Sequence, residues 1–441
     1  MTTCIEASKG GLIRPRRPNL RALTGIRFLA ALHVLIQHCC PMLIAAFAAH
    51  VAQITSSRGQ ILKVLGLVIA EAITGFASCG YVSVSLFFVL SGFILAYNYE
   101  PEALGQPSGA AKFWFSRFAR IYPVYLLAWV LFLPMGVADA RKYPIGGLGW
   151  SGTAFALGAA SLGLVQTWFP PLSLRWNSPA WSLSVEAFCY LMFPLILVRC
   201  RRVSLARLKT DRFVWYCIVG LWLFSTSASL CFNLCDAGHR AASEATGGYV
   251  AASNWVWSLR YFPLLRLPEF VIGLLMGRLF VADLAQGRRR LKGMALPLML
   301  FAMAVISFSR RLPRDLLSTG FLAPVFAVAL YDLAHKGKLA RRLSGRVIVL
   351  LGESSYSMYI LHVPVLILLN HAAAKLWPKI FQGVSPKGLG VVAPSLLYFV
   401  GQLTIVVIIA VASFRYIETP ARYLLKRMAR DPRPVELACA T

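Results

Sequence analysis

The sequence predicts an all-helical polytopic membrane protein, with about ten transmembrane helices and one further helix that is re-entrant or interfacial. Two observations lead to this fold class. Of the 441 residues, 58% are hydrophobic and only 14% are charged, whereas a soluble domain is about 25% charged. Apolar runs also recur along the whole chain, and most are close to the ~20 residues that a helix needs to cross the hydrocarbon core.

Ten apolar runs are long enough to be read as membrane spans. They cover residues 22–46, 81–99, 115–137, 181–198, 213–232, 261–280, 293–308, 315–333, 354–373 and 394–414. An eleventh run, 151–168, is ambiguous. Placing all basic clusters in the cytoplasm requires this run to begin and end on the outside, which favours a re-entrant or interfacial helix.

The formal net charge of +28 follows the membrane topology and does not indicate a nucleic-acid partner. The basic residues cluster between apolar runs, near residues 14–21, 112–120, 199–212, 288–292, 336–346 and 422–430. This pattern predicts a basic cytoplasmic N-terminus over 1–21, a transmembrane domain over 22–414 and a basic cytoplasmic tail over 415–441. Arg310, Arg311 and Arg314 are an exception, because they fall on the opposite side.

Ionisable residues inside membrane spans are costly and point to function. Arg27 and His38 lie eleven residues apart in the first span. At 3.6 residues per turn they share one helix face, about 16 Å apart along the axis, and can look into one cavity from opposite depths. His33 points elsewhere. The structural alternative is that His38 bonds a neighbouring helix and that Arg27 snorkels to the interface.

Three further ionisable positions stand near span ends. Arg117 and Arg120 share a helix face at the cytoplasmic mouth of their span, where a pair of guanidinium groups suits phosphate recognition. The alternative is ordinary positive-inside anchoring. Glu186 lies about five residues inside the outer end of its span, where a carboxylate needs a partner or a substrate hydroxyl.

The remaining polar positions favour structural or supporting roles. Glu269 lies at an outer span entry, and Tyr359 and His362 share one face of a later span. Gly273 and Gly277 form a small-xxx-small pair that predicts close helix packing.

Taken in order, these motifs resemble the membrane-bound acyltransferase 3 family, whose bacterial members O-acylate surface polysaccharides, nodulation factors and macrolides. The matching segments are LRALTGIRFLAALHVLIQH (20–38), GYVSVSLFFVLSGFIL (80–95), SRFARIYPVY (116–125), NSPAWSLSVEAFCYLMFP (177–194), LPEFVIGLLMG (267–277), LGESSYSMYILHVP (351–364) and YIETPARYLLKR (416–427). The resemblance implies a multi-pass protein of the bacterial inner membrane, and the basic clusters place both termini in the cytoplasm. A second Glu often follows the acidic position in the family, but Ala187 stands here.

The resemblance also implies a reaction, in which an acyl group passes from cytoplasmic acyl-CoA to a hydroxyl of a glycan or glycolipid. Acetyl is the family default. His38 is expected to act as general base or as a transient acyl acceptor, and Glu186 to orient the hydroxyl or a partner. Arg27, Arg117 and Arg120 are expected to hold the donor phosphates. Acyl-CoA is a co-substrate, and neither a bound cofactor nor a metal is expected.

The main alternative from another functional class is a multi-pass transporter or exporter of a sugar or acyl compound. Buried Arg, His and Glu also serve proton relays. Paired halves with broken helices, which many transporters show, are not evident in the sequence.

Overall fold

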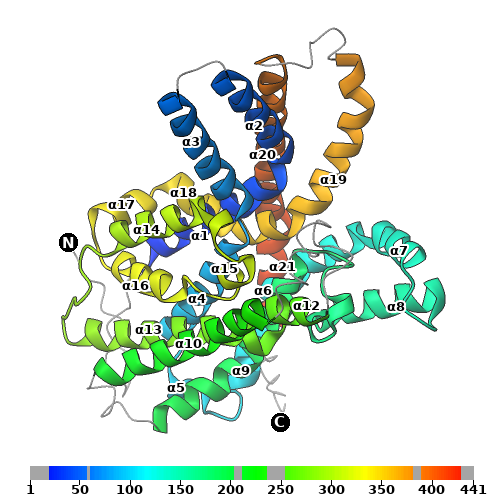
Figure 1. Cartoon of the computed structure of the whole chain (residues 1–441). Coiled ribbons are helices and arrows are strands. Elements are labelled where there is room, and N and C mark those ends of the chain that lie inside the picture. Colours follow the sequence, from blue (N-terminus) through cyan, green and yellow to red (C-terminus); the bar gives the residue numbers. More distant parts are fainter. Residues whose placement is uncertain (1–18, 57–59, 203–210, 236–253, 381–388, 429–441) are drawn as a thin grey trace.

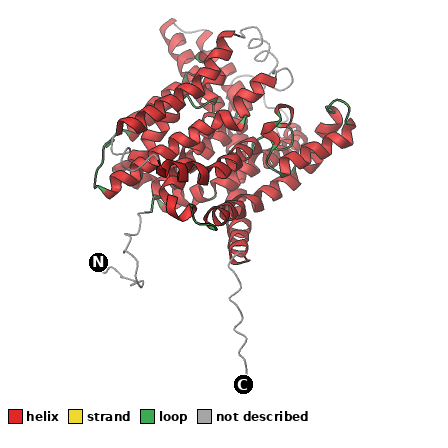
Figure 2. Cartoon of the chain, turned by 90° about the horizontal axis from the view of Figure 1, so that it is seen from below, coloured by secondary structure: helices red, strands yellow, loops and turns green. Residues whose placement is uncertain are grey.

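The computed structural model describes residues 19–56, 60–202, 211–235, 254–380 and 389–428, and every regular element in these ranges is a helix (Figure 2). The first part of the chain forms α1 (Arg21–Cys39), α2 (Pro41–Ser56), α3 (Gln60–Ser78), α4 (Val82–Asn98), α5 (Pro101–Leu104), α6 (Gly109–Leu131), α7 (Leu133–Lys142), α8 (Gly149–Leu162), η1 (Gln166–Trp168), η2 (Pro170–Leu172) and α9 (Ala180–Arg202). The second part forms α10 (Asp211–Cys235), α12 (Asn254–Tyr261), α13 (Pro263–Ala285), α14 (Ala295–Ser307), η3 (Ser309–Arg311), α15 (Arg314–Ser318), α16 (Ala323–Ala334), α17 (Lys338–Leu343), α18 (Arg346–Glu353), α19 (Ser355–Ile380), α20 (Leu389–Ser413), η4 (Phe414–Glu418) and α21 (Thr419–Met428). Figure 1 shows them as one bundle.

Six described helical segments are long and apolar enough to cross a membrane, or up to eight if each of two bent helix pairs forms one span. The expected count of about ten is therefore not confirmed. Two predicted spans account for the difference. The run 293–308 becomes α14, which has only 13 residues, and the run 261–280 becomes α13, which carries Arg266, Glu269, Arg278 and Asp283. Many large apolar side chains of the bundle are exposed, as expected where the partner is lipid.

Two predicted spans are broken by proline. The run 22–46 ends as α1 at Cys39, and α2 begins at Pro41. The run 115–137 bends by 54° between α6 and α7, where Pro134 occupies the first turn of α7. Proline has no N–H to donate and its ring crowds the preceding turn, so each helix ends just before it. The structure also adds most of α2 and all of α3, which the predicted spans do not include.

The ambiguous run 151–168 forms α8 followed by the short helix η1. The 14 residues of α8 rise about 21 Å, less than the ~30 Å of a hydrocarbon core, so this helix is too short to cross alone. It packs beside α7 at one side of the bundle (Figure 1).

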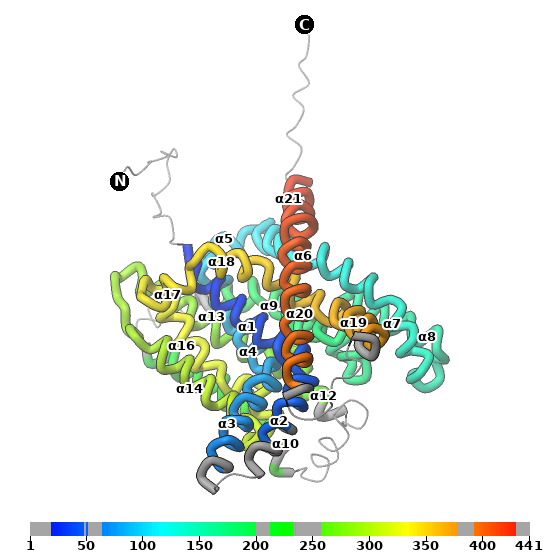
Figure 3. Tube along the Cα trace, turned by 90° about the horizontal axis from the view of Figure 1, so that it is seen from above, coloured from blue at the N-terminus to red at the C-terminus, as the bar shows by residue number. Residues whose placement is uncertain are grey.

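The positions of the first and last described helices can be compared with the predicted cytoplasmic N-terminus and tail. The start of α1 and the end of α21 lie on the same side of the molecule (Figure 3). The expected tail from residue 415 begins as helix, because α20 continues through η4 into α21. Residues 1–18 and 429–441, and most of the loop 233–260, lie outside the described residues.

Helices α4 and α13 pack at backbone distance, which confirms the close packing predicted from Gly273 and Gly277. A Cβ added at Gly273 would lie 1.9 Å from the carbonyl oxygen of Val89 on α4, and one added at Gly92 would lie 2.0 Å from the carbonyl oxygen of Phe270. Because each helix presents a glycine to the other's backbone, the interface admits no larger residue on either side. This contact fixes the α4 side chains that line the site.

Replacing Gly273 by alanine should lower stability more than any other single-methyl addition on α13, because the Val89 carbonyl is backbone and has to shift. Overpacking of this kind costs about 1–3 kcal/mol. Thermal unfolding of the purified protein in detergent measures the loss. Gly401→Ala is the control, since nothing lies within 4 Å of a Cβ built there. Equal unfolding temperatures for the two variants would contradict the packing argument.

Candidate active site

Two neighbouring cavities lie at successive depths of the bundle. The larger, about 530 Å³, is lined by the beginning of α1 and by most of the length of α4. The smaller, about 100 Å³, is lined by the end of α1 and the beginning of α4. Arg27 lines the first and His38 the second. The single cavity expected from the shared helix face is thus divided, with Arg27 and His38 at its two depths as the helical spacing predicts.

The larger cavity, called here the arginine cavity, gathers the three predicted donor-binding residues Arg27, Arg117 and Arg120. Arg117 is fixed by its surroundings, because its Nη2 donates to the Tyr99 hydroxyl over 3.2 Å and its guanidinium lies 5.6 Å from the centre of the Phe113 ring. Three guanidinium groups around one cavity give a site that suits an anionic ligand such as a phosphate.

Glu186 also lines the arginine cavity and does not line the smaller cavity that holds His38. Its Oε1 accepts hydrogen bonds from the hydroxyls of Ser91, over 3.3 Å, and Tyr190. Arg27 interacts electrostatically with Glu186 and with Arg120. The carboxylate therefore lies among the arginines and is placed to balance and orient them.

The smaller cavity, called here the histidine chamber, brings His38 together with His362 of α19, with ring centres 4.8 Å apart. His362 Nδ1 lies 2.6 Å from the carbonyl oxygen of Tyr359. A carbonyl can only accept, so Nδ1 carries the proton and Nε2 is a bare acceptor. This buried Nε2 has no hydrogen-bond partner among the described residues. His362, for which the sequence favoured a structural role, thus lines the same chamber as His38.

His33 points away from both cavities, as predicted from its place on the helix. Its Nδ1 lies 2.8 Å from the Ser83 hydroxyl and its Nε2 lies 2.8 Å from the carbonyl oxygen of Phe76. Both ring nitrogens are therefore used in joining α1 to α3 and α4.

Val84 and Tyr359 line both cavities and so form the partition between them. The Tyr359 hydroxyl donates to the carbonyl oxygen of Pro179 over 3.2 Å and accepts from the Ser182 hydroxyl over 2.8 Å. These two bonds hold the phenol ring between α19 and α9. A group that crossed this partition from the arginine cavity toward His38 would lie against this ring.

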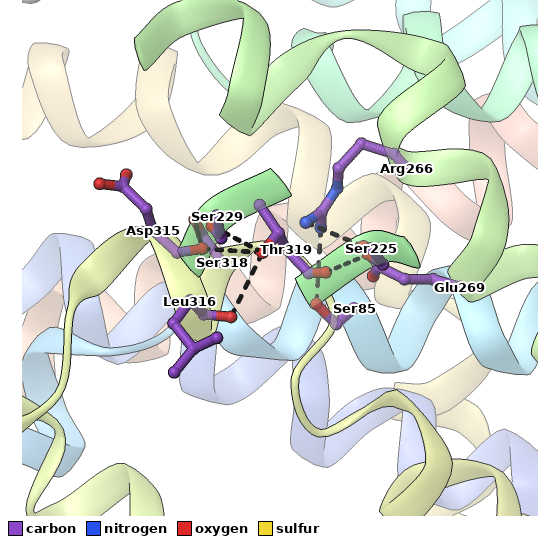
Figure 4. A network of polar contacts seen from close by, with 9 residues as sticks. All are labelled: Ser85, Ser225, Ser229, Arg266, Glu269, Asp315, Leu316, Ser318 and Thr319. Carbon is purple, nitrogen blue, oxygen red and sulfur yellow. Dashed lines mark hydrogen bonds and ion pairs between the residues drawn. The ribbon is translucent and has the colours of Figure 1, made fainter. Parts of the chain in front are cut away.

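Glu269 forms a buried ion pair with Arg266, and Figure 4 shows both side chains in the polar network between α13 and its neighbours. Arg266 Nη1 lies 2.9 Å from Glu269 Oε1, and the two side chains are 1% and 0% exposed. The guanidinium also donates to the Ser85 hydroxyl over 3.5 Å and faces the Trp181 ring at 5.5 Å. Glu269 thus holds Arg266, which lines the histidine chamber.

Sequence reasoning did not select Arg260, Arg266 or Arg314, which all line the histidine chamber. They come from α12, α13 and α15, so only the tertiary fold brings them together. Two signals were present in the sequence. Arg266 precedes Glu269 by three residues, the spacing of an ion pair on one helix face. Arg314 belongs to the basic group that departs from the positive-inside pattern.

Comparisons with known proteins identify the family of the chain. The chain matches the acyltransferase domain family (Acyl_transf_3) over residues 20–415. It is 29% identical to the acyltransferase MdmB of Streptomyces mycarofaciens over 356 residues, which cover 80% of each chain. It is 23% identical to the peptidoglycan O-acetyltransferase OatA of Listeria monocytogenes over 389 residues, which cover 82% of this chain and 54% of that protein. No solved structure gives a significant match.

The family match extends over nearly the whole chain and includes every residue that lines the two cavities except Asn19. It confirms the resemblance drawn from the motifs, and together with the named relatives it supports acyltransferase activity over the transporter alternative. The apolar helices agree with a multi-pass membrane location. The chain belongs to the acyltransferase 3 family of membrane O-acyltransferases.

Proposed function

We propose that the protein transfers a short acyl group, acetyl by default, from acyl-CoA in the arginine cavity to a hydroxyl of a glycan or glycolipid in the histidine chamber. The observation that carries this proposal is the division of the site into a large cationic cavity and a small chamber with two histidines. The larger volume falls within the ~300–1,000 Å³ of small-molecule sites, and the smaller one is well below it. The smaller chamber suits only the reacting ends of the substrates.

In the proposed reaction the acceptor oxygen attacks the thioester carbonyl carbon while a ring nitrogen of His38 takes the hydroxyl proton. The C–S bond then breaks, and the CoA sulfur leaves and regains a proton. His362 is a positioning residue in this scheme. Its bare Nε2 is an acceptor beside the His38 ring; once the His38 N–H turns to it in the proposed reaction, the other His38 nitrogen is left to take the hydroxyl proton. Arg27, Arg117 and Arg120 hold the donor phosphates.

Mass spectrometry of surface glycans and lipids tests the proposed function. Cells with the native protein, with a folded His38→Ala variant and with no protein are compared. One ester-linked acyl group found only with the native protein supports the proposal and identifies the acceptor. Identical spectra from all three, with transfer of labelled acetyl from acetyl-CoA also absent in the purified protein, would reject it.

Arg120→Gln should raise the KM for acetyl-CoA by about 10- to 100-fold with a smaller change in kcat. A hydrogen bond to a charged group contributes about 1.5–3 kcal/mol, and each 1.4 kcal/mol is about tenfold in affinity. Steady-state kinetics with labelled acetyl-CoA measures the change. Lys112→Gln is the matched control, because Lys112 is an exposed cation of the same helix that does not line the cavity. An unchanged KM in Arg120→Gln would remove this residue from donor binding.

Tyr359→Ala should broaden acyl-chain selectivity, because it removes the ring that narrows the partition. One extra methylene is rejected by about 10- to 200-fold in a fitted pocket, so the ratio of butyryl to acetyl transfer should rise by at least about tenfold. Parallel assays with acetyl-CoA and butyryl-CoA measure kcat/KM. Tyr359→Phe keeps the ring and should keep the selectivity. If the alanine variant retained the native ratio, the partition would not set chain length.

A further inference from the structure

The histidine chamber is lined by positively charged side chains. Transfer of an acyl group to the hydroxyl of a neutral acceptor would not require them. Arg260, Arg266 and Arg314 line it beside the two histidines, and among the described residues that line it none is acidic. Their carboxylate partners lie behind the chamber wall. Arg266 pairs with Glu269 over 2.9 Å, and Arg260 pairs with Asp315 over 2.5 Å.

Arg314 differs from the other two arginines of the chamber. It is exposed, and its guanidinium lies 5.0 Å from the centre of the Tyr81 ring, with no ion pair to a described carboxylate. Its cationic head therefore stands at the mouth of the chamber, supported by an aromatic face. Three guanidinium groups thus surround a cavity of about 100 Å³, and two of them are paired with carboxylates outside it. The third charge has no such partner among the described residues, so the chamber has a net positive potential.

The other lining groups suit a saccharide. The aromatic rings of Trp181 and Tyr261 lie side by side with centres 4.8 Å apart, and such rings pack against the C–H faces of sugars. Gln37 and Ser178 add hydrogen-bonding groups. The chamber is too small for the phosphates and nucleotide of the donor, which fit the arginine cavity instead.

We infer that the acceptor is an anionic saccharide, in which a carboxylate or a phosphate lies close to the accepting hydroxyl and is held by Arg314 at the mouth of the histidine chamber. This inference rests on the proposed function and adds the chemical class of the acceptor. Arg266 also lines this positively charged chamber, and its ion pair with Glu269 holds it in place.

The test measures the binding of small sugars to the purified protein in nanodiscs by saturation-transfer NMR. The salt concentration is about 0.15 M, at which exposed charges are screened beyond ~8 Å. The probes are methyl glucoside, methyl glucuronide and glucose 6-phosphate. At least one anionic probe should bind about 10-fold or more tightly than the neutral one, as one charge-assisted contact implies. The anionic probe that binds more tightly tells a carboxylate acceptor from a phosphate one.

Variants assign the effect to the chamber. Arg314→Gln should reduce the preference to about threefold or less, and Arg314→Lys should keep most of it. Arg310→Gln removes an exposed arginine four residues away that does not line the chamber, and it should behave like the native protein. Equal affinity of neutral and anionic probes, or equal losses in Arg310→Gln and Arg314→Gln, would overturn the inference.

Acetyl-CoA binding in the same samples separates this inference from the proposed function. If acetyl-CoA binds and the anionic preference is absent, the inference fails and the proposed function stands. If acetyl-CoA does not bind at all, the proposed function fails. Should Arg314→Gln weaken acetyl-CoA instead of the sugar acids, the chamber holds the donor phosphates and the inference is wrong.

Discussion

His38→Ala should lower kcat for acyl transfer by about 10²- to 10⁴-fold, the contribution of a positioned general base, and should leave the KM for acetyl-CoA nearly unchanged. The proposed base lies in the histidine chamber, whereas the arginines proposed to bind the donor line the other cavity. The side chain is half-buried and makes no hydrogen bond to another described residue, so its loss leaves no unsatisfied partner. Single-turnover transfer of labelled acetyl measures the effect.

His33→Ala on the same helix is the informative control for this prediction. This substitution removes the contacts to Ser83 and Phe76 that join α1 to α3 and α4, so it should lower the unfolding temperature. Activity per folded molecule should stay close to native. If His38→Ala retained more than about a tenth of the native kcat while folded, the general base would have to be another group.

The helical period explains why the two depths of the site were visible in the sequence. Arg27 and His38 share a face of α1, and Tyr359 and His362 share a face of α19, because residues near whole turns apart align on one helix. Such relations lie within single elements, and the sequence contains them completely. The close approach of α4 and α13 was predictable for the same reason, since the spacing of Gly273 and Gly277 places both on one face.

Relations between elements were not accessible in this way. The partition at Tyr359 depends on a bond to Pro179, which is 180 residues away in the chain. The place of Glu186 among the arginines depends on how α9 packs against α4 and α6, and the span position alone suggested a role on the outer side. Where a polar side chain inside the membrane points is set by its partners, and these come from other helices.

The count of spans was limited by a different cause. Hydropathy detects uniform apolar runs of sufficient length, and α13 does not form one because it carries four charged residues. These charges are accommodated by neighbours, such as Glu269 by Arg266 and Asp283 by Arg290. A helix whose charges are all paired inside a bundle is compatible with the membrane interior, although its composition alone does not show this.

Glu269→Gln should destabilise the protein by about 3–5 kcal/mol, the effect of removing one partner of a buried ion pair. Both side chains are essentially inaccessible, so the Arg266 charge would stay buried without its counter-charge. Chemical or thermal unfolding in detergent measures the loss. Glu100→Gln is the control, because it weakens the ion pair of Glu100 with Arg278, another arginine of α13. These two side chains are 27% and 13% exposed, so a loss of only about 0–1 kcal/mol is expected.

The double replacement Arg266→Met/Glu269→Leu distinguishes a purely structural role of the ion pair from a role in acyl transfer. Apolar side chains of similar volume in place of a buried pair are often neutral or stabilising, so the double variant should unfold near the native temperature. It also removes one cation from the histidine chamber. If the pair serves only packing, the double variant keeps its activity. If Glu269 serves to hold Arg266 at the wall of the chamber, the double variant is folded but transfers the acyl group slowly. We expect the second result, because an apolar pair would satisfy this core without a buried charge.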